Sequence, residues 1–180
     1  MKPKREVVDG AVSLAAEAGW SLGRHFDDND AGAMAVVGVH VRRGDKVVEA
    51  APPSWKDYAK GAEACALQIA AAAEGNGAPL MPSVRVYVSS DSAASGGEAM
   101  WQAEQGWQVQ YTTLGGQPHN ISLRVAVANE KGLTDGVAES GMLRTHQVAS
   151  VSQYARQAMR AALVLSESDC LVTTFSSNMG

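Results

Sequence analysis

The chain has 180 residues, 46% of them hydrophobic and 19% charged, which is ordinary for one globular domain or one lobe of a larger enzyme. Its formal net charge of −4 argues against a nucleic-acid partner, because neutralising backbone phosphates requires a broad basic surface. The two cysteines, Cys65 and Cys170, are too few and too isolated for a disulfide scaffold or a zinc site. We therefore expect both to pack as small hydrophobic side chains.

Residues 1–35 are expected to form an N-terminal helix followed by a polar linker. Residues 1–9 contain basic side chains but no apolar run long enough for a signal peptide or a membrane span, so we expect no membrane segment in this chain. Apolar spacing from Val12 to Leu22 predicts a short amphipathic helix. The acidic run at 27–30 lacks the ligand spacing and the closing Glu of a calcium loop, which favours a solvated linker.

The apolar run Val36–Val41 is rich in β-branched residues, which predicts a buried strand of an α/β sheet. Basic and acidic side chains follow at once, in the segment 42–46. The carboxyl ends of strands in open α/β sheets face the ligand crevice, so these side chains are expected to lie there. Arginine and lysine in this position suit a phosphate group, although a solvated charge cluster is an equally plausible interpretation from Arg-Arg-Gly-Asp alone.

Two further elements of a βαβ arrangement follow. The prolines before Ser54 prevent an earlier helix start, and the Ala-rich segment from Trp55 to about Ala73 predicts a helix packed on the sheet. Its first turn contains Tyr58, which we expect to face the basic loop. A second strand is predicted over Val84–Ser89, and it leads to Asp91.

The second half of the chain is less regular. The pattern predicts a helix over 93–105, a strand over 107–113, a helix over 147–165 and a buried strand over 170–175. The segment 114–145 lacks a sustained period, so most of it is interpreted as an inserted loop. Within it, Asn120-Ile121-Ser122 is a formal glycosylation sequon that would matter only in a secretory compartment.

Three stretches carry a family resemblance, and they all lie at predicted strand ends. They are His40-Val41-Arg42-Arg43-Gly44-Asp45-Lys46-Val47, Arg85-Val86-Tyr87-Val88-Ser89-Ser90-Asp91 and Ser168-Asp169-Cys170-Leu171-Val172-Thr173-Thr174-Phe175-Ser176-Ser177-Asn178. In this order they resemble the motifs of the α-1,6-fucosyltransferases of glycosyltransferase family 23. Glu49-Ala50-Ala51 followed by Tyr58 matches the same motif, whereas the His-x-Arg-Arg-x-Asp pattern alone is shared with α-1,2-fucosyltransferases.

The resemblance implies an inverting enzyme that transfers fucose from GDP-fucose to the core N-acetylglucosamine of an N-glycan in the Golgi, without a metal or another cofactor. By that resemblance Arg42 would hold the β-phosphate, Lys46 would support the departing diphosphate and Glu49 would take the acceptor's proton. His40 would touch guanine. The remaining donor-site residues would be Arg43, Asp45, Tyr58, Asp91, Ser176 and Ser177. Core packing is the alternative role for Tyr58 and Ser176.

The sequence departs from the family pattern in several places: Ala161 stands where the family has an Asp that reads guanine, the loop from Lys46 to Glu49 is one residue shorter, and Asp91-Ser92 replaces a pair of Asp residues. The alternatives left open are another sugar-nucleotide transferase, such as an α-1,2-fucosyltransferase-like enzyme, and a non-catalytic remnant of the donor-binding lobe. Residues 36–180 are expected to form that lobe, truncated at both ends, with the insertion near 114–145.

The predicted fold class is α/β, as the donor-binding half of a GT-B-like enzyme. We expect a three-layer, Rossmann-like lobe in which strands 36–41, 84–89 and 170–174 are parallel neighbours, with helices on both faces of the sheet. His40, Asp91 and Ser176 would then share one edge of it.

Overall fold

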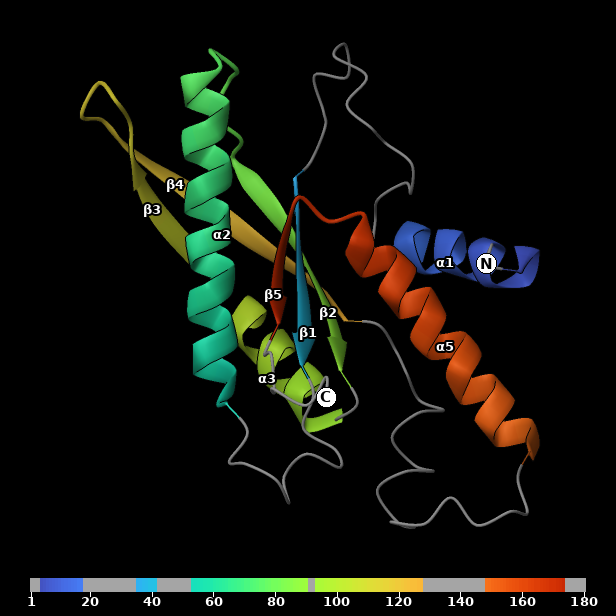
Figure 1. Cartoon of the computed structure of the whole chain (residues 1–180). Helices are drawn as coiled ribbons and strands as arrows, with labels where there is room; N and C mark the ends of the chain where they lie inside the picture. The colour runs from blue at the N-terminus through green and yellow to red at the C-terminus, as the bar shows by residue number, and fades with distance from the viewer. Residues whose placement is uncertain (1–3, 18–34, 42–52, 91–92, 128–147, 174–180) are drawn as a thin grey trace, which may run out of the picture.

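The protein is an α/β unit built on one five-stranded sheet, which is seen here in a computed structural model (Figure 1). The structure describes residues 4–17, 35–41, 53–90, 93–127 and 148–173. The helices are α1 (Arg5–Glu17), α2 (Trp55–Gly75), α3 (Ala93–Glu104) and α5 (Val148–Ser166). The strands are β1 (Val36–Val41), β2 (Ser83–Ser90), β3 (Gln108–Thr112), β4 (Pro118–Val127) and β5 (Cys170–Thr173).

The strand order is β3-β4-β2-β1-β5, and only the outermost pair, β3 with β4, is antiparallel. The prediction that β1, β2 and β5 are parallel neighbours is confirmed, with β1 in the middle. Asp169 fixes the alignment of β5. Its carboxylate accepts the Val36 N–H at 2.7 Å, and its own N–H donates to the Val36 carbonyl at 2.8 Å.

One face of the sheet is covered by α2 and α3, and it contains the larger core. Side chains at alternate positions, among them Val37, Val39 and Val41 of β1 and Val86 of β2, pack there against the helices. Trp55 of α2 and Trp107 meet edge to face in the same core, with ring centroids 6.2 Å apart. The alternation follows from the pleat, because successive side chains of a strand point to opposite faces.

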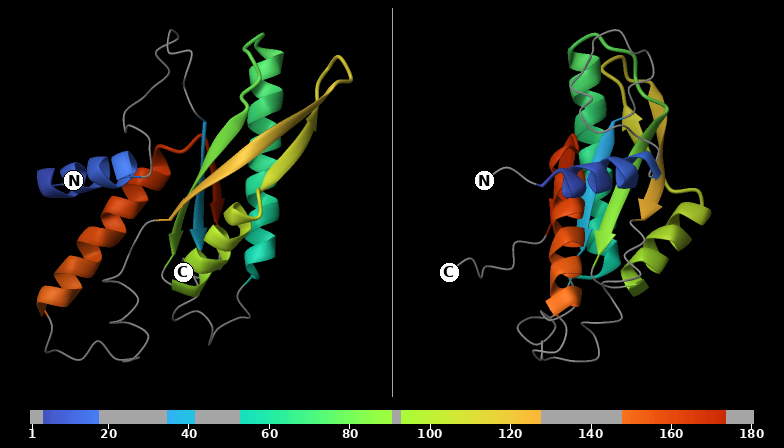
Figure 2. Two further views of the ribbon diagram at one scale, coloured as in Figure 1. Left: turned by 180° about the vertical axis from the view of Figure 1, so that it is seen from behind. Right: turned by 90° about the vertical axis from the view of Figure 1, so that its right-hand side faces the viewer.

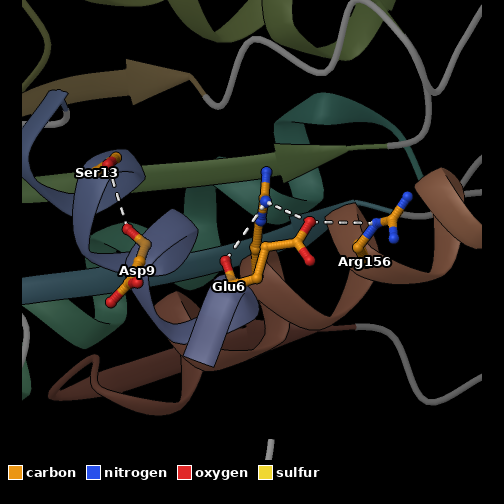
Figure 3. Close-up of polar contacts among 5 residues, drawn as sticks. Glu6, Asp9, Ser13 and Arg156 are labelled. Atoms are coloured by element: carbon orange, nitrogen blue, oxygen red, sulfur yellow. Dashed lines mark hydrogen bonds and ion pairs between the residues drawn. The ribbon is translucent and has the colours of Figure 1, made fainter. Parts of the chain in front are cut away.

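The opposite face is covered by α1 and α5, as Figures 1 and 2 show. Ala11 and Ala15 of α1 pack there with Val36, Tyr87 and Val164. At the rim of this contact Glu6 lies between two arginines of α5 (Figure 3). Its carboxylate is 3.7 Å from Nε of Arg156 and 4.0 Å from a guanidinium nitrogen of Arg160. Helix α1 is thus packed into the same body as the sheet.

The observed helix α1 differs from the predicted one, because it begins at Arg5 rather than near Val12. Its buried stripe is formed by Val7, Ala11 and Ala15, which are spaced four residues apart. The charged residues around Val7 obscured the first turn of this stripe in the sequence. Residues 18–22, the end of the predicted helix, lie outside the described residues.

The prediction that most of 114–145 is loop was wrong for residues 118–127, which form β4. This strand lies inside the sheet, between β3 and β2. Its buried side chains, Ile121 and Leu123, alternate with polar Asn120, Ser122 and Arg124. The tight turn at Gly116, with φ of 77°, joins it to β3 as a hairpin. The period-two pattern is therefore present, although His and Asn at its start mask it.

The expectation for the cysteines was also wrong, because Cys65 of α2 and Cys170 of β5 form a disulfide, with Cα atoms 5.8 Å apart. The two residues are separated by 105 positions in the chain. They meet because β5 pairs with β1 and directs Cys170 to the face of the sheet that α2 covers. Sequence spacing could not reveal this contact. Close packing supports the same contact, since a Cβ on Gly61 would lie 2.7 Å from a Val172 methyl group.

Helix α2 begins at a capping arrangement between Ser54 and Asp57, which confirms the predicted start. The Asp57 carboxylate accepts the Ser54 hydroxyl at 2.7 Å and the Ser54 N–H at 3.0 Å. These hydrogen bonds lower the pKa of Asp57 below its ordinary value of 3.8, and the bond from the Ser54 hydroxyl has the larger effect. The folded state therefore gains stability from this carboxylate above pH 3.8, and it loses that stability as the pH falls through the lowered pKa.

We expect Asp57→Asn to lower the free energy of unfolding at pH 7, and the difference from the wild type to vanish as the pH is lowered through the folded-state pKa of Asp57. Urea denaturation at a series of pH values measures this directly. Asp9→Asn is the matched control, because the Asp9 carboxylate makes an exposed ion pair with Arg5 and not a helix cap. Equal losses in the two variants at neutral pH would contradict the capping role.

Candidate functional site

The candidate site is the carboxyl edge of the sheet, where the parallel strands β2, β1 and β5 end side by side. His40 of β1 is aligned with Ser89 of β2 on one side and with Thr173 of β5 on the other. The strand order also reverses here, since the chain proceeds from β1 to β2 and β4 in one direction and then adds β5 on the other side of β1. Ligands of open α/β sheets bind at such reversal points.

Polar side chains form a row across this edge. Ser89, His40 and Thr173 all stand on the face covered by α1 and α5, because the residues that precede them, Val88, Val39 and Val172, point to α2. Ser89 is buried, and His40 and Thr173 are half-buried. The row therefore places two hydroxyls and an imidazole at the carboxyl end of the sheet.

Helix α5 packs on β1 at the amino half of the strand rather than at this edge. A Cβ on Gly38 would lie 2.6 Å from the Ser168 hydroxyl and 3.0 Å from a Leu165 methyl group, so glycine allows the close approach just after α5 ends. Only the carboxyl end of α5 lies close to the strands, and toward its amino end the helix diverges from them at an angle, as the views from the front and from behind show (Figures 1 and 2). The close packing thus lies at the amino half, away from His40.

Of the predicted site residues, the structure describes His40 and Tyr58. His40 lies at the carboxyl edge, as expected. Tyr58 is 2% exposed and belongs to the core between α2 and the sheet, which supports the packing role. The other predicted site residues lie outside the described residues. They are Arg42, Arg43, Asp45, Lys46, Glu49, Asp91, Ser176 and Ser177.

The chain segments that hold those residues leave the sheet at the candidate edge. Residues 42–52 follow β1, residue 91 follows β2 and residues 174–180 follow β5, and these three strands are parallel neighbours. Helix α2, which comes after the first segment, begins at Trp55. The described structure thus brings the three strand exits to one edge of one sheet.

Ala161 lies in α5 and is 6% exposed. A carboxylate at this buried position would need a compensating partner, since burial disfavours an isolated charge. The helix therefore provides an apolar contact where the family pattern has an acid. This residue contributes no group that could read a base.

Two basic side chains lie elsewhere on the sheet, toward the amino end of β2. Arg85 of β2 is aligned with Arg124 of β4, on the face opposite α2. Burial, and after it the positive charge of Arg124, lowers the pKa of Arg85. Since Arg85 precedes Ser89 by four residues along the strand, this pair is remote from the candidate edge.

Sequence reasoning did not include Ser89 and Thr173 among the site residues. Both are hydroxyl residues at the ends of apolar strands, a signal that was visible, but their alignment with His40 depends on the strand order. Within the described residues no cluster of three metal-ligating side chains is found, and none of the described helices is long and apolar enough to cross a membrane.

Comparison of the chain with protein-family models, with curated proteins and with solved structures finds no match. The candidate site consequently stands on the strand order, the alignment of the polar row and the motifs that follow the strands.

Proposed function

We propose that the chain is the donor-binding lobe of a glycosyltransferase of the GT-B kind, which transfers fucose from GDP-fucose to the core N-acetylglucosamine of an N-glycan. The observation that carries the proposal is the meeting of β2, β1 and β5 at one edge, next to the reversal in strand order. The three stretches that resemble family 23 fucosyltransferases include or follow the ends of these strands. The site of action would be the Golgi lumen.

Fixed cations would supply most of the donor chemistry. Cleavage of the bond between fucose and the diphosphate leaves negative charge on GDP, and a positioned guanidinium and ammonium stabilise that charge as it develops. By resemblance Arg42 would bind the β-phosphate and Lys46 would support the leaving group. This arrangement needs no metal ion. His40, at the edge of the sheet, would contact the base.

Glu49 would act as the general base. An acceptor hydroxyl becomes a better nucleophile when a carboxylate within hydrogen-bond distance takes its proton during attack on the sugar carbon. Attack on the face opposite the diphosphate inverts the configuration at that carbon. The role of Glu49 is taken from its match to the family motif.

A second candidate is a related transferase that uses another sugar nucleotide, and the buried Ala161 favours it. Guanine recognition in the family relies on an acid at that position, and a buried alanine cannot replace its hydrogen bonds. The phosphate clamp does not depend on the base. Binding of GDP in comparison with UDP distinguishes the two candidates.

We expect Arg42→Ala to weaken GDP binding by about 1.5–3 kcal/mol, which is roughly ten- to a hundredfold, because a charge-assisted phosphate contact is lost. Arg43→Ala should weaken GDP binding less than Arg42→Ala does. Neighbouring side chains of an extended chain point in opposite directions, so only one of the two arginines can enter the same phosphate site. Isothermal titration calorimetry with GDP measures both variants.

Arg43→Ala is the matched control, since it removes the same charge one residue further on. An equal loss in both variants would mean that net charge rather than a defined contact attracts the nucleotide. A larger loss at Arg43 would reject the assignment of Arg42. UDP binding as tight as GDP binding would favour the second candidate.

A further inference from the structure

The geometry points to a modification site on the β3–β4 hairpin: we propose that Asn120 carries an N-linked glycan. This proposal is independent of the proposed function, because it depends on neither the donor site nor its residues. Asn120-Ile121-Ser122 has the acceptor pattern Asn-x-Ser, and the middle residue is not proline. Two features of the fold support the use of this pattern: the exposure of Asn120, which leaves room for a glycan in the folded protein, and the disulfide, which points to an oxidising compartment.

The first feature is the orientation of Asn120 in β4. Ile121, the next residue, is 1% exposed and packs in the core beneath α2, so Asn120 stands on the opposite face of the strand. It is exposed, and Gln110, its aligned partner on β3, is exposed as well. The side-chain amide of Asn120 makes no hydrogen bond with the part of the chain that the structure describes. A glycan on this amide is therefore compatible with the folded protein.

Room for a glycan exists on this face of the hairpin. Exposed Gln108, Gln110 and Thr112 of β3 line it beside Asn120, so a sugar would contact polar side chains. Seen from behind, none of the described helices lies in front of the hairpin (Figure 2, left). On the other face Glu74 of α2 accepts hydrogen bonds from the Tyr111 hydroxyl at 2.7 Å and the Leu114 N–H at 2.9 Å. The hairpin is thus held from one side and open on the other.

The second feature is the disulfide between Cys65 and Cys170. Structural disulfides form and persist in oxidising compartments, such as the lumen of the secretory pathway, and they are rare in the cytosol. This is the compartment in which Asn-x-Ser sequences become glycosylated. The disulfide lies in another part of the fold, between α2 and β5, so it is independent of the sequon.

The reaction joins the side-chain nitrogen of Asn120 to an oligosaccharide carried on a lipid diphosphate. A bond forms between that nitrogen and C1 of the first sugar, and the bond between C1 and the diphosphate oxygen breaks. The amide gives up one proton, and the lipid diphosphate leaves. No oxidation or reduction takes place. The hydroxyl of Ser122 is required because the modifying enzyme recognises it.

The test is expression of the 180-residue chain behind a cleavable secretion signal in cultured animal cells, with protease protection to confirm entry into the lumen. We expect one glycan, seen as a mobility shift that peptide N-glycosidase removes with conversion of Asn120 to aspartate. Asn120→Gln and Ser122→Ala should abolish the shift. Ser122→Thr, which retains the hydroxyl, is the matched control and should retain it.

The glycan is attached while the chain enters the lumen. The mobility shift is therefore measured on all protease-protected chains, including those of a variant that does not fold afterwards. An unshifted wild-type chain inside the lumen would overturn the proposal. A shift that persists in Asn120→Gln would also overturn it, since the glycan would then be attached elsewhere. Mass spectrometry of the peptide that contains Asn120 identifies the modified residue.

Discussion

Replacement of Cys65 and Cys170 by serine should lower the free energy of unfolding by about 4–5 kcal/mol, the largest loss of stability that we expect from a change at a single contact. The two residues are 105 positions apart, so the disulfide closes a long loop and removes much of the conformational freedom of the unfolded chain. Such a loss is a large part of the stability of an ordinary domain. Denaturant unfolding of the oxidised wild type and the double variant measures it.

Reduction provides the control for this prediction. The reduced wild type should unfold with nearly the same free energy as the Cys65→Ser/Cys170→Ser variant, and reductant should leave the variant unchanged. Because the disulfide joins α2 to the edge strand β5, amide hydrogen exchange in the reduced protein should become faster at 170–173 than elsewhere in the sheet. An oxidised wild type that is no more stable than the variant would show that the disulfide does not form.

Glu49→Gln should lower the rate of fucosyl transfer by about 10²–10⁴-fold, because a general base contributes a factor of this size. The amide has nearly the same shape as the carboxylate but cannot accept the proton of the acceptor hydroxyl. GDP binding should be unchanged, since the base does not contact the phosphates. Release of GDP from GDP-fucose, with an N-glycan core as acceptor, is the measurement.

Glu63→Gln is a suitable control, because Glu63 is a carboxylate of α2 that accepts the Trp107 indole N–H at 2.8 Å and plays no part in the proposed chemistry. The Glu63→Gln variant should transfer fucose at the wild-type rate. If Glu49→Gln is as active as the wild type, another group is the base. A wild-type chain that binds GDP but transfers no sugar would fit a donor-binding lobe on its own as well as the non-catalytic remnant.

Much of the sheet could be predicted from local pattern. The β-branched run 36–41 is a continuous apolar segment, and burial of β1 between β2 and β5 requires that composition. The prediction of a buried strand at 170–175 was right about the strand but wrong about its burial, because β5 is an edge strand in which Leu171 is 50% exposed. Helices α2 and α5 were recognised from apolar spacing and end signals, such as Ser54 before α2. These elements can be recognised from local sequence because each packs against a neighbour that is close in sequence or against a uniformly apolar surface.

The features that sequence reasoning missed depend on contacts between distant segments. Strand β4 is bordered by a polar hairpin turn, and its burial is clear only once it lies between β2 and β3. The pairing of Cys65 with Cys170 requires the reversal in strand order that places β5 beside β1. The strands that carry Ser89, His40 and Thr173 were predicted as neighbours, but the register that aligns these three residues could not be predicted from the chain alone.

The role of Tyr58 shows how a motif and a core position can coincide. Its place in the first turn of α2 suits the family pattern, and its 2% exposure suits the core. A tyrosine in this position can fill the core with its ring while its hydroxyl reaches a partner. Tyr58→Phe therefore separates the two roles, since it keeps the ring and removes the hydroxyl.

The most direct test of the central claim, that a GDP-sugar binds at the carboxyl edge of the sheet, is backbone amide NMR of the chain titrated with GDP. The claim predicts chemical-shift changes concentrated at His40, Ser89 and Thr173, with the β3–β4 hairpin unaffected. The changes should be much smaller in Arg42→Ala at a GDP concentration that half-saturates the wild type. Changes centred on the hairpin, or no change at the ends of β1, β2 and β5 at saturating GDP, would contradict it.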